Sequence, residues 1–224
     1  MSADRWIRWV LKPIVFAAGL LPLAFLGWRA LNADLGADPL IEITHETGDW
    51  TLRFIVIALA ITPVRRLARW NALIRFRRMM GLYAFFYGTL HFLIYVIADR
   101  FAGLEFQNGI WAWSTVRELL ASIWEDIAKR PYITVGFLGL SAMLPLALTS
   151  TAWSIRRMGG RNWQRLHRLI YVTAIAGVVH YWWLVKADIL HPAIYASLVV
   201  ILLGYRLVLS LKKYGFRPQL EPSR

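Results

Sequence analysis

Five histidines carry most of the redox or metal chemistry available to this sequence, and three of them stand in or at the ends of apolar stretches: His91, His167 and His180. An ionisable residue inside a membrane-spanning segment is costly to bury and is by default a candidate functional residue. The chain has no cysteine, which excludes disulfides, thiolate metal sites, iron–sulfur clusters and c-type haem attachment. Imidazole is therefore the metal ligand of interest.

The spacing of these histidines places two of them at nearly the same depth. His91 follows the basic residue Arg78 by thirteen positions, and His180 follows His167, next to Arg168, by the same number. At about 1.5 Å per residue both lie about 20 Å along parallel helices. Two imidazoles that face each other across a helix bundle are what axial ligation of a b-type haem requires. The pattern predicts His91 and His180 as haem iron ligands, with His167 as a further candidate.

Other interpretations of the histidines stay open at this stage. A single histidine in a span commonly hydrogen-bonds to a neighbouring helix. A proton relay would normally include a buried Asp or Glu, and metal transport would need further ligands at the same depth, which the spans lack. His45, in an acidic segment, and His191, at the edge of the last apolar stretch, are expected at ordinary interfacial positions.

The elements that position these residues are predicted to be membrane helices. The 224 residues are 58% hydrophobic and 17% charged, with mean hydropathy +0.47, which is typical of a membrane protein. We expect an all-α fold and one integral membrane domain over residues 1–224, because no stretch is left for a soluble catalytic domain. The six predicted spans are residues 10–31, 50–64, 80–98, 132–152, 167–186 and 192–211.

One predicted helix does not span. Residues 115–129 place apolar side chains on one face, which predicts an amphipathic helix on the outer membrane surface. It is either a plain connector or a docking platform for a partner.

The charges predict the orientation of the chain. The net charge of +13 is concentrated in alternate connections and in the two termini. By the positive-inside rule both termini are cytoplasmic, and the multi-pass chain lies in a bacterial inner membrane, with no role in nucleic-acid binding. The basic side carries Arg5, Arg8, Lys12, Arg65, Arg66, Arg69, Arg75, Arg77, Arg78, Arg156, Arg157, Arg161, Arg165, Arg168, Lys212, Lys213, Arg217 and Arg224. The opposite side carries Asp34, Asp38, Glu42, Glu46, Asp49, Asp99, Glu105, Glu118, Glu125, Asp126 and Asp188.

Seven short motifs occur in a fixed order between residue 36 and about residue 186. They are GADP (36–39), TG with Trp50 (47–50), TPVRR (62–66), RRMMGL leading to His91 (77–82), RPYI (130–133), LTS (148–150) and WQRLHRL (163–169). Each motif is modest, but together they are specific. The chain resembles the MsrQ family, formerly YedZ, the haem-binding membrane subunit of a bacterial methionine sulfoxide reductase system.

The resemblance implies a ferric-reductase-like transmembrane domain with b-type haem. In that family electrons pass from quinol or a cytoplasmic flavin reductase to a periplasmic molybdopterin enzyme that reduces methionine sulfoxide in oxidised proteins. The membrane subunit transfers electrons and is not itself the sulfoxide-reducing catalyst. FMN is also attributed to the family. The resemblance carries the haem ligands onto His91 and His180, with His167 as the further candidate.

The resemblance also bears on haem number. The wider ferric-reductase group uses two histidines on each of two helices, but here Arg78 stands thirteen residues before His91, where a second ligand would be expected. Arginine does not ligate iron, so one haem is expected and a second is left open. His167 could instead contact a haem propionate or a flavin.

The arginines of the basic side have two interpretations. Arg77, Arg78, Arg165 and Arg168 could contact a flavin phosphate, haem propionates or an acidic reductase. Most of these arginines need no specific ligand. Their positive charge orients the chain in the membrane and binds anionic membrane lipids.

The sequence leaves two alternative functions beside the one that the resemblance implies. One is a quinol-linked cytochrome b for another periplasmic oxidoreductase, and the other is a cofactor-free transporter. No G-x-G-x-x-G motif follows a strand, so direct binding of NAD(P)H is not expected. The electron donor, the acceptor, the flavin site and the oligomeric state are not fixed by the sequence.

Overall fold

The computed structural model describes residues 3–97, 113–185 and 187–215, and this part of the chain is helical, without strands. The all-α prediction is confirmed. In chain order the elements are α1 (Ala3–Trp6), η1 (Ile7–Leu11), α2 (Lys12–Leu31), α3 (Pro39–Leu67), η2 (Asn71–Phe76), α4 (Arg77–Ile94), α5 (Trp113–Lys129), α6 (Pro131–Leu148), α7 (Ala152–Met158), α8 (Gly160–Leu166), α9 (Leu169–Leu184) and α10 (Leu190–Gly215).

Five stretches of helix in the described residues are long and apolar enough to cross a membrane. They are Asp4–Leu31, Pro39–Leu67, Asn71–Ile97, Pro131–Leu148 and Leu190–Lys212. These correspond to five of the six predicted spans, with ends displaced by a few residues in most cases. The predicted span 167–186 corresponds to α9, which has 16 residues and is shorter than the others. The sixth crossing stays a prediction.

The largest difference from the predicted spans is at α3. The sequence predicts a span over 50–64 and a loop before it, whereas the helix begins at Pro39 and includes His45. Proline at the first position and Asp38 as N-cap, accepting from the Ile41 amide at 3.1 Å, favour an early start. Polar residues in the first part of α3, which resemble a loop in the sequence, have partners within the helix. Arg53, for example, lies 3.1 Å from Asp49.

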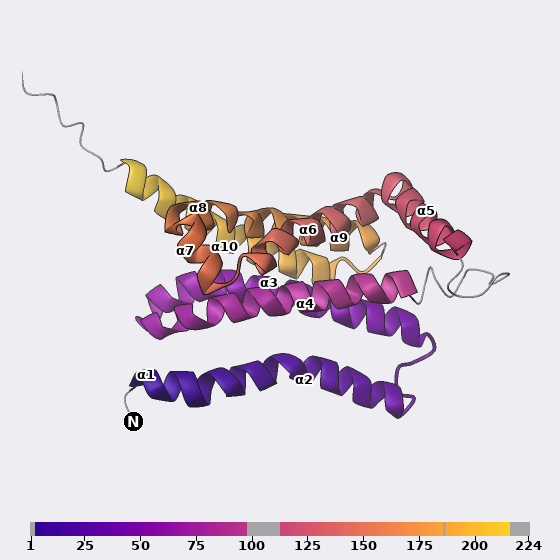
Figure 1. Cartoon of the computed structure of the whole chain (residues 1–224), viewed down its shortest axis with the longest axis horizontal. Coiled ribbons are helices and arrows are strands. Elements are labelled where there is room, and N and C mark those ends of the chain that lie inside the picture. Colours follow the sequence, from indigo (N-terminus) through magenta and orange to yellow (C-terminus); the bar gives the residue numbers. More distant parts are fainter. Residues whose placement is uncertain (1–2, 98–112, 186, 216–224) are drawn as a thin grey trace, which may run out of the picture.

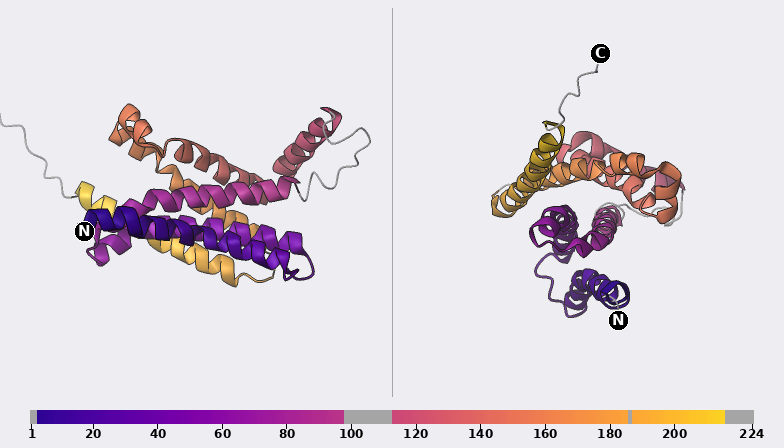
Figure 2. Two further views of the ribbon diagram at one scale, coloured as in Figure 1. Left: turned by 60° about the horizontal axis from the view of Figure 1, so that its bottom comes forward. Right: turned by 90° about the vertical axis from the view of Figure 1, so that its left-hand side faces the viewer.

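The bundle is built from two helical pairs that pack against each other. Helix α3 runs along α4, and α6 runs along α9; α4 then contacts α6, and α3 contacts α9. Helix α10 packs on α9 and α3, while α2 lies on the outer side of α3 and α4 (Figures 1 and 2). The four paired helices therefore surround a common interior.

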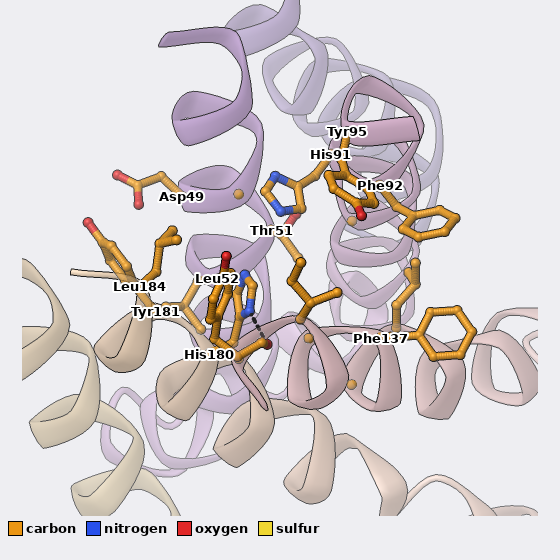
Figure 3. A pocket seen from close by; sticks show the side chains of 18 of the residues that line it. Asp49, Thr51, Leu52, His91, Phe92, Tyr95, Phe137, His180, Tyr181 and Leu184 are labelled. Carbon is orange, nitrogen blue, oxygen red and sulfur yellow. Dashed lines mark hydrogen bonds between the residues drawn. The ribbon is translucent and has the colours of Figure 1, made fainter. Parts of the chain in front are cut away.

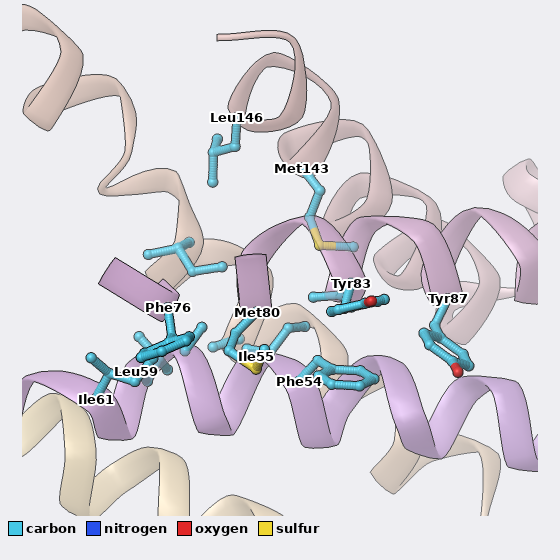
Figure 4. Packing of buried hydrophobic residues seen from close by; sticks show 14 of the residues in the cluster. Phe54, Ile55, Leu59, Ile61, Phe76, Met80, Tyr83, Tyr87, Met143 and Leu146 are labelled. Atoms are coloured by element: carbon cyan, nitrogen blue, oxygen red, sulfur yellow. The ribbon is translucent and has the colours of Figure 1, made fainter. Parts of the chain in front are cut away.

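Aromatic side chains pack between α3 and α4 (Figure 4), and two of their hydroxyls reach α2. The rings of Phe54 and Tyr83 stack with centroids 5.1 Å apart, and Tyr87 packs on Phe54 at 5.3 Å. The two tyrosine hydroxyls donate across to α2, Tyr83 to the Phe16 carbonyl at 2.5 Å and Tyr87 to the Gly19 carbonyl at 2.9 Å. Buried hydroxyls need such partners, so they fix the position of α2.

The two ends of the bundle differ in the charges of their connections. The α3–α4 connection, α7, α8 and the last turns of α10 lie at one end, called the basic end here (Figure 1). The α2–α3 connection, α5 and the starts of α6 and α10 lie at the other, the acidic end. The predicted separation of charge is present in the fold, although Asp99, Glu105, Arg217 and Arg224 lie outside the described residues.

Helix α5 covers the residues of the predicted helix 115–129 and stands beside the bundle at the acidic end (Figure 1), while its place on the outer membrane surface stays a prediction. Its buried residue Asp126 accepts a hydrogen bond from the Tyr95 hydroxyl at 2.5 Å and an ion pair from Arg130 at 3.2 Å. The Thr134 hydroxyl donates to the Ile127 carbonyl. These contacts tie α5 to α4 and α6.

Candidate functional site

A cavity of about 500 Å³ lies between α3, α4, α6 and α9 in their acidic-end halves (Figure 3). This volume is within the range of small-molecule and cofactor sites. Its lining is mainly apolar, and it includes four of the five histidines: His45, His91, His180 and His191. The rings of His91 and His180 both project into it (Figure 3).

His91, from α4, is held by the backbone of α3. Its Nδ1 lies 3.0 Å from the carbonyl oxygen of Thr44. A carbonyl only accepts, so Nδ1 carries the proton and Nε2 of the neutral ring keeps a lone pair. Gly48, one helical turn after Thr44, gives the ring its space, because a Cβ there would lie 3.2 Å from Cε1 and Nδ1.

His180, from α9, is held in the same way by α6. Its Nδ1 lies 2.7 Å from the carbonyl oxygen of Tyr132. Gly136 is again one helical turn further on, and a Cβ there would lie only 2.7 Å from Nδ1. Since real Cβ atoms do not approach other atoms so closely, the ring position requires glycine at 136.

The two halves of the site match along the histidine helices as well. Both histidines end the same short pattern, G-x-x-H, with Gly88 three residues before His91 and Gly177 three residues before His180. Residues three apart lie on one face of a helix, and both glycines line the cavity. Met143 and Thr51 pack on Gly88, and Leu52 packs on Gly177; these side chains also line the cavity.

The separation of the two rings fits one metal ion between them. The ring centroids of His91 and His180 are 6.2 Å apart, and the ring planes make an angle of 81°. A ligating imidazole nitrogen lies about 2 Å from its metal, with the ring centre roughly 1 Å behind it, so two opposed imidazoles have centres about 6 Å apart. With both Nδ1 atoms occupied, the ligand atom on each ring is Nε2.

The donor set favours haem over a protein-ligated metal ion. Within the described residues no three His, Cys, Asp or Glu side chains cluster as a metal site would need. The two histidine nitrogens are too few to hold a first-row metal ion on their own. In a haem, the porphyrin supplies the other four ligands of the iron. The mainly apolar cavity into which both imidazoles project is an environment that suits a porphyrin.

The cavity has two chemically different ends. Its floor, toward the middle of the bundle, is formed by apolar side chains such as Ile55, Leu140 and Met143. Helices α3 and α6 both begin at the acidic end, so lining residues early in these helices lie at the opposite end of the cavity, called the mouth here. The mouth includes His45, Arg130 and His191, with Tyr95 and Asp49.

His167 lies away from this cavity. It follows α8, its Nδ1 lies 3.1 Å from the Trp163 carbonyl, and its ring stacks on the Trp163 indole at 3.7 Å. Its Nε2 is buried without a hydrogen-bond partner in the described residues. The structure therefore separates His167 from the His91 and His180 pair.

The four arginines singled out from the sequence also lie away from the cavity. Arg77 begins α4 and is half-buried, near Arg65 and Arg206, while Arg78, Arg165 and Arg168 are exposed. None of the four lines the space that holds His91 and His180. Any contact that they make with a ligand is at the basic end.

The sequence did not indicate the mouth residues. His45 and His191 were expected at ordinary interfacial positions, and Arg130 was noted only as part of a motif, yet all three line the cavity. The G-x-x-H pattern, present twice, was a signal that could have been found. The neighbourhood of His45 could not, because it depends on α3 beginning at Pro39.

Comparisons with known proteins show the family to which the chain belongs. Residues 47–178 match the family model described as "Ferric reductase like transmembrane component". A protein-methionine-sulfoxide reductase heme-binding subunit MsrQ of Xanthomonas oryzae pv. oryzae is 48% identical over 203 residues, covering 88% of this chain and 85% of the relative. The protein of the same name from Herminiimonas arsenicoxydans is 46% identical over 199 residues, covering 88% and 84%. Among solved structures there is no match.

Proposed function

Because this chain belongs to the MsrQ family of haem-binding subunits, within the wider ferric-reductase-like transmembrane group, we propose that it is the electron-transferring membrane subunit of a methionine sulfoxide reductase system. In this proposal it accepts electrons from quinol or a cytoplasmic flavin reductase. It delivers them to a periplasmic molybdopterin enzyme that repairs oxidised proteins and carries out the sulfoxide chemistry.

The observation that carries the proposal is the matched pair of histidines. His91 and His180 come from different helical pairs, and each is aimed by a backbone carbonyl of the neighbouring helix and given space by a glycine one turn away. Ring centres 6.2 Å apart then suit axial ligation of one iron. We propose His91 and His180 as the axial ligands of a single haem b, which supplies reversible one-electron transfer when bound.

The residues around the pair hold and shield the site. The carbonyls of Thr44 and Tyr132 fix the tautomer of both imidazoles, so that Nε2 stays an acceptor. Apolar side chains of the floor, including Leu52 and Ile55, exclude water from that side. His91 and His180 would hold the iron from both sides, which suits one-electron transfer and would leave no position for substrate.

The direction of transfer follows from the proposed topology. With the basic end in the cytoplasm, the cavity lies in the periplasmic half of an inner membrane, close to the surface where the acceptor would dock. The half-buried Arg77, with Arg65 and Arg206 nearby, lies at the end where a cytoplasmic donor would approach. FMN, implied by the family resemblance, would have to bind outside the His91 and His180 cavity, and His167 and the arginines of the basic end are its candidate contacts.

A visible spectrum of the purified full-length chain tests this proposal. We expect a Soret band and low-spin haem, with most of the low-spin absorbance lost in His91→Ala and in His180→Ala. His167→Ala is the matched control, because its ring lies outside the cavity, and it should keep the low-spin spectrum. Absence of a Soret band after expression with ample haem would overturn the electron-transfer function.

A further inference from the structure

The mouth of the cavity gathers basic side chains that the proposed ligation of iron does not use. Arg130, His45 and His191 line it, and all three are exposed. Neither His45 nor His191 has a hydrogen-bond partner among the residues that the structure describes. These side chains are therefore available to an anion that enters the mouth.

Two of the three guanidinium nitrogens of Arg130 have partners, and donors remain on the terminal nitrogens. Its Nε lies 3.2 Å from Asp126 Oδ1, while its Nη1 lies 3.5 Å from the Tyr132 hydroxyl, at the limit of a hydrogen bond. The terminal nitrogens of the guanidinium thus keep donors for a further acceptor. A guanidinium presents its donors in a planar fork that matches a carboxylate.

The negative charge at the mouth is already neutralised. Asp49 is the carboxylate among the described lining residues, and its Oδ2 lies 3.1 Å from Arg53 Nη2. Asp126, which does not line the cavity, is occupied by Tyr95 and Arg130. An incoming carboxylate would meet the hydrogen-bond donors of the mouth without facing an unpaired acid of the described lining.

The mouth is also linked in sequence to the two proposed ligands. His45 directly follows Thr44, whose carbonyl holds His91, and Arg130 stands two residues before Tyr132, whose carbonyl holds His180. A flat molecule bound between the imidazoles would therefore have one edge beside these side chains. Its opposite edge would lie against Ile55, Leu140 and Met143 of the floor.

We infer that the cavity mouth binds the two propionate carboxylates of the haem, with Arg130, His45 and His191 as their partners; this rests on the proposed haem site. Burying a carboxylate against the apolar floor would leave it without partners, which is very costly. The methyl and vinyl edge of the macrocycle fits the floor instead. In this proposal the mouth determines which edge of the haem faces outward, independently of the iron ligands.

The test compares haem b with haem dimethyl ester, in which both propionates are esterified. Each is loaded into the full-length chain in detergent, and the rate of its transfer to apomyoglobin is measured. Charge-assisted hydrogen bonds of this kind correspond to roughly tenfold or more in equilibrium. We expect the wild-type protein to lose the ester about tenfold faster than haem b.

Variants of the mouth should remove that difference. Arg130→Gln should lose haem b about tenfold faster than wild type while losing the ester at nearly the wild-type rate. Lys129→Gln is the matched control, because Lys129 is adjacent in sequence but does not line the cavity. If Arg130→Gln does not fold, the double variant His45→Gln/His191→Gln decides the question with the same comparison, because neither ring carries a structural hydrogen bond in the described residues.

Spectrum and potential separate this inference from the function on which it rests. All mouth variants should keep the low-spin spectrum. The midpoint potential should fall in Arg130→Gln, because the lost cation disfavours the added electron. Equal effects of a variant on haem b and on the ester, or no difference between the two in wild type, would overturn the propionate site while leaving His91 and His180 as ligands. A wild-type chain that binds no haem would overturn the proposed function itself.

Discussion

Gly136 lies directly beneath the ring of His180, so close that a Cβ at this position would stand 2.7 Å from Nδ1. The corresponding distance from Gly48 to His91 is 3.2 Å, which a small shift of the ring could relieve. The two halves of the site have the same arrangement, but they differ in how well they tolerate an added side chain. The His180 half is the tighter one.

Gly136→Ala is expected to disrupt the site more than Gly48→Ala. The added methyl must displace His180 from the Tyr132 carbonyl, and overpacking of this kind costs about 1–3 kcal/mol. We expect Gly136→Ala to lose most low-spin haem absorbance, Gly48→Ala to lose less, and Gly81→Ala, where a Cβ meets nothing within 4 Å, to lose none. Spectra of the three variants at equal protein concentration check the order, and equal losses in all three would contradict it.

Tyr87→Phe should loosen α2. The Tyr87 hydroxyl donates to the Gly19 carbonyl at 2.9 Å and accepts from the Leu23 amide at 3.2 Å, and the ring is buried. Its removal leaves a buried carbonyl unpaired at a cost of about 1–3 kcal/mol. We expect faster amide hydrogen exchange in α2 with an unchanged haem spectrum. Tyr205→Phe, in α10, serves as the control, and equal exchange in α2 for both variants would argue against the anchor.

The absence of cysteine makes the orientation of the chain directly measurable. Ala37→Cys lies in the exposed α2–α3 connection at the acidic end, and Asn162→Cys is exposed in α8 at the basic end. A membrane-impermeant maleimide applied to spheroplasts should label position 37 at once and position 162 only after the membrane is opened. The reverse pattern would place the acidic end in the cytoplasm.

Asp126→Asn should release α5 from the bundle. Asp126 is 6% exposed and takes contacts from Tyr95 and Arg130, so the variant removes an ion pair around a buried carboxylate. Hydrogen bonds to a charged group contribute about 1.5–3 kcal/mol, so their weakening at this carboxyl should be measurable. Amide exchange over residues 116–129 should rise. Lys129→Gln, whose partner Glu125 is exposed, should change it little; an equal rise in both would contradict the role of Asp126.

The sequence predicted much of the helical framework and the histidine pair, because both depend on local quantities. Apolar length and charge asymmetry indicate spans, and helical rise alone sets His91 and His180 at one depth. The start of α3 was missed because Thr44 and Thr47 resemble a polar loop. Their hydroxyls instead donate to carbonyls one turn earlier, at 2.7 Å to Leu40 and 2.8 Å to Ile43.

The partners of the histidines could not be read from the sequence at all. That His91 meets Thr44 and that His180 meets Tyr132 depends on how α4 packs on α3 and α9 on α6, which is set by side chains along whole helices. The contribution of Arg130 to the cavity mouth has the same origin. Long-range packing, rather than any local pattern, brings these residues to one place.

The groups that aim both imidazoles are main-chain carbonyls, and this has an evolutionary consequence. Point mutation at residues 44 and 132 changes a side chain but leaves the carbonyl in place. The orientation of each imidazole therefore depends on how the helices pack. It can be kept when the side chains at residues 44 and 132 change. Selection at this site would fall instead on Gly48 and Gly136, where the absence of a side chain is the requirement.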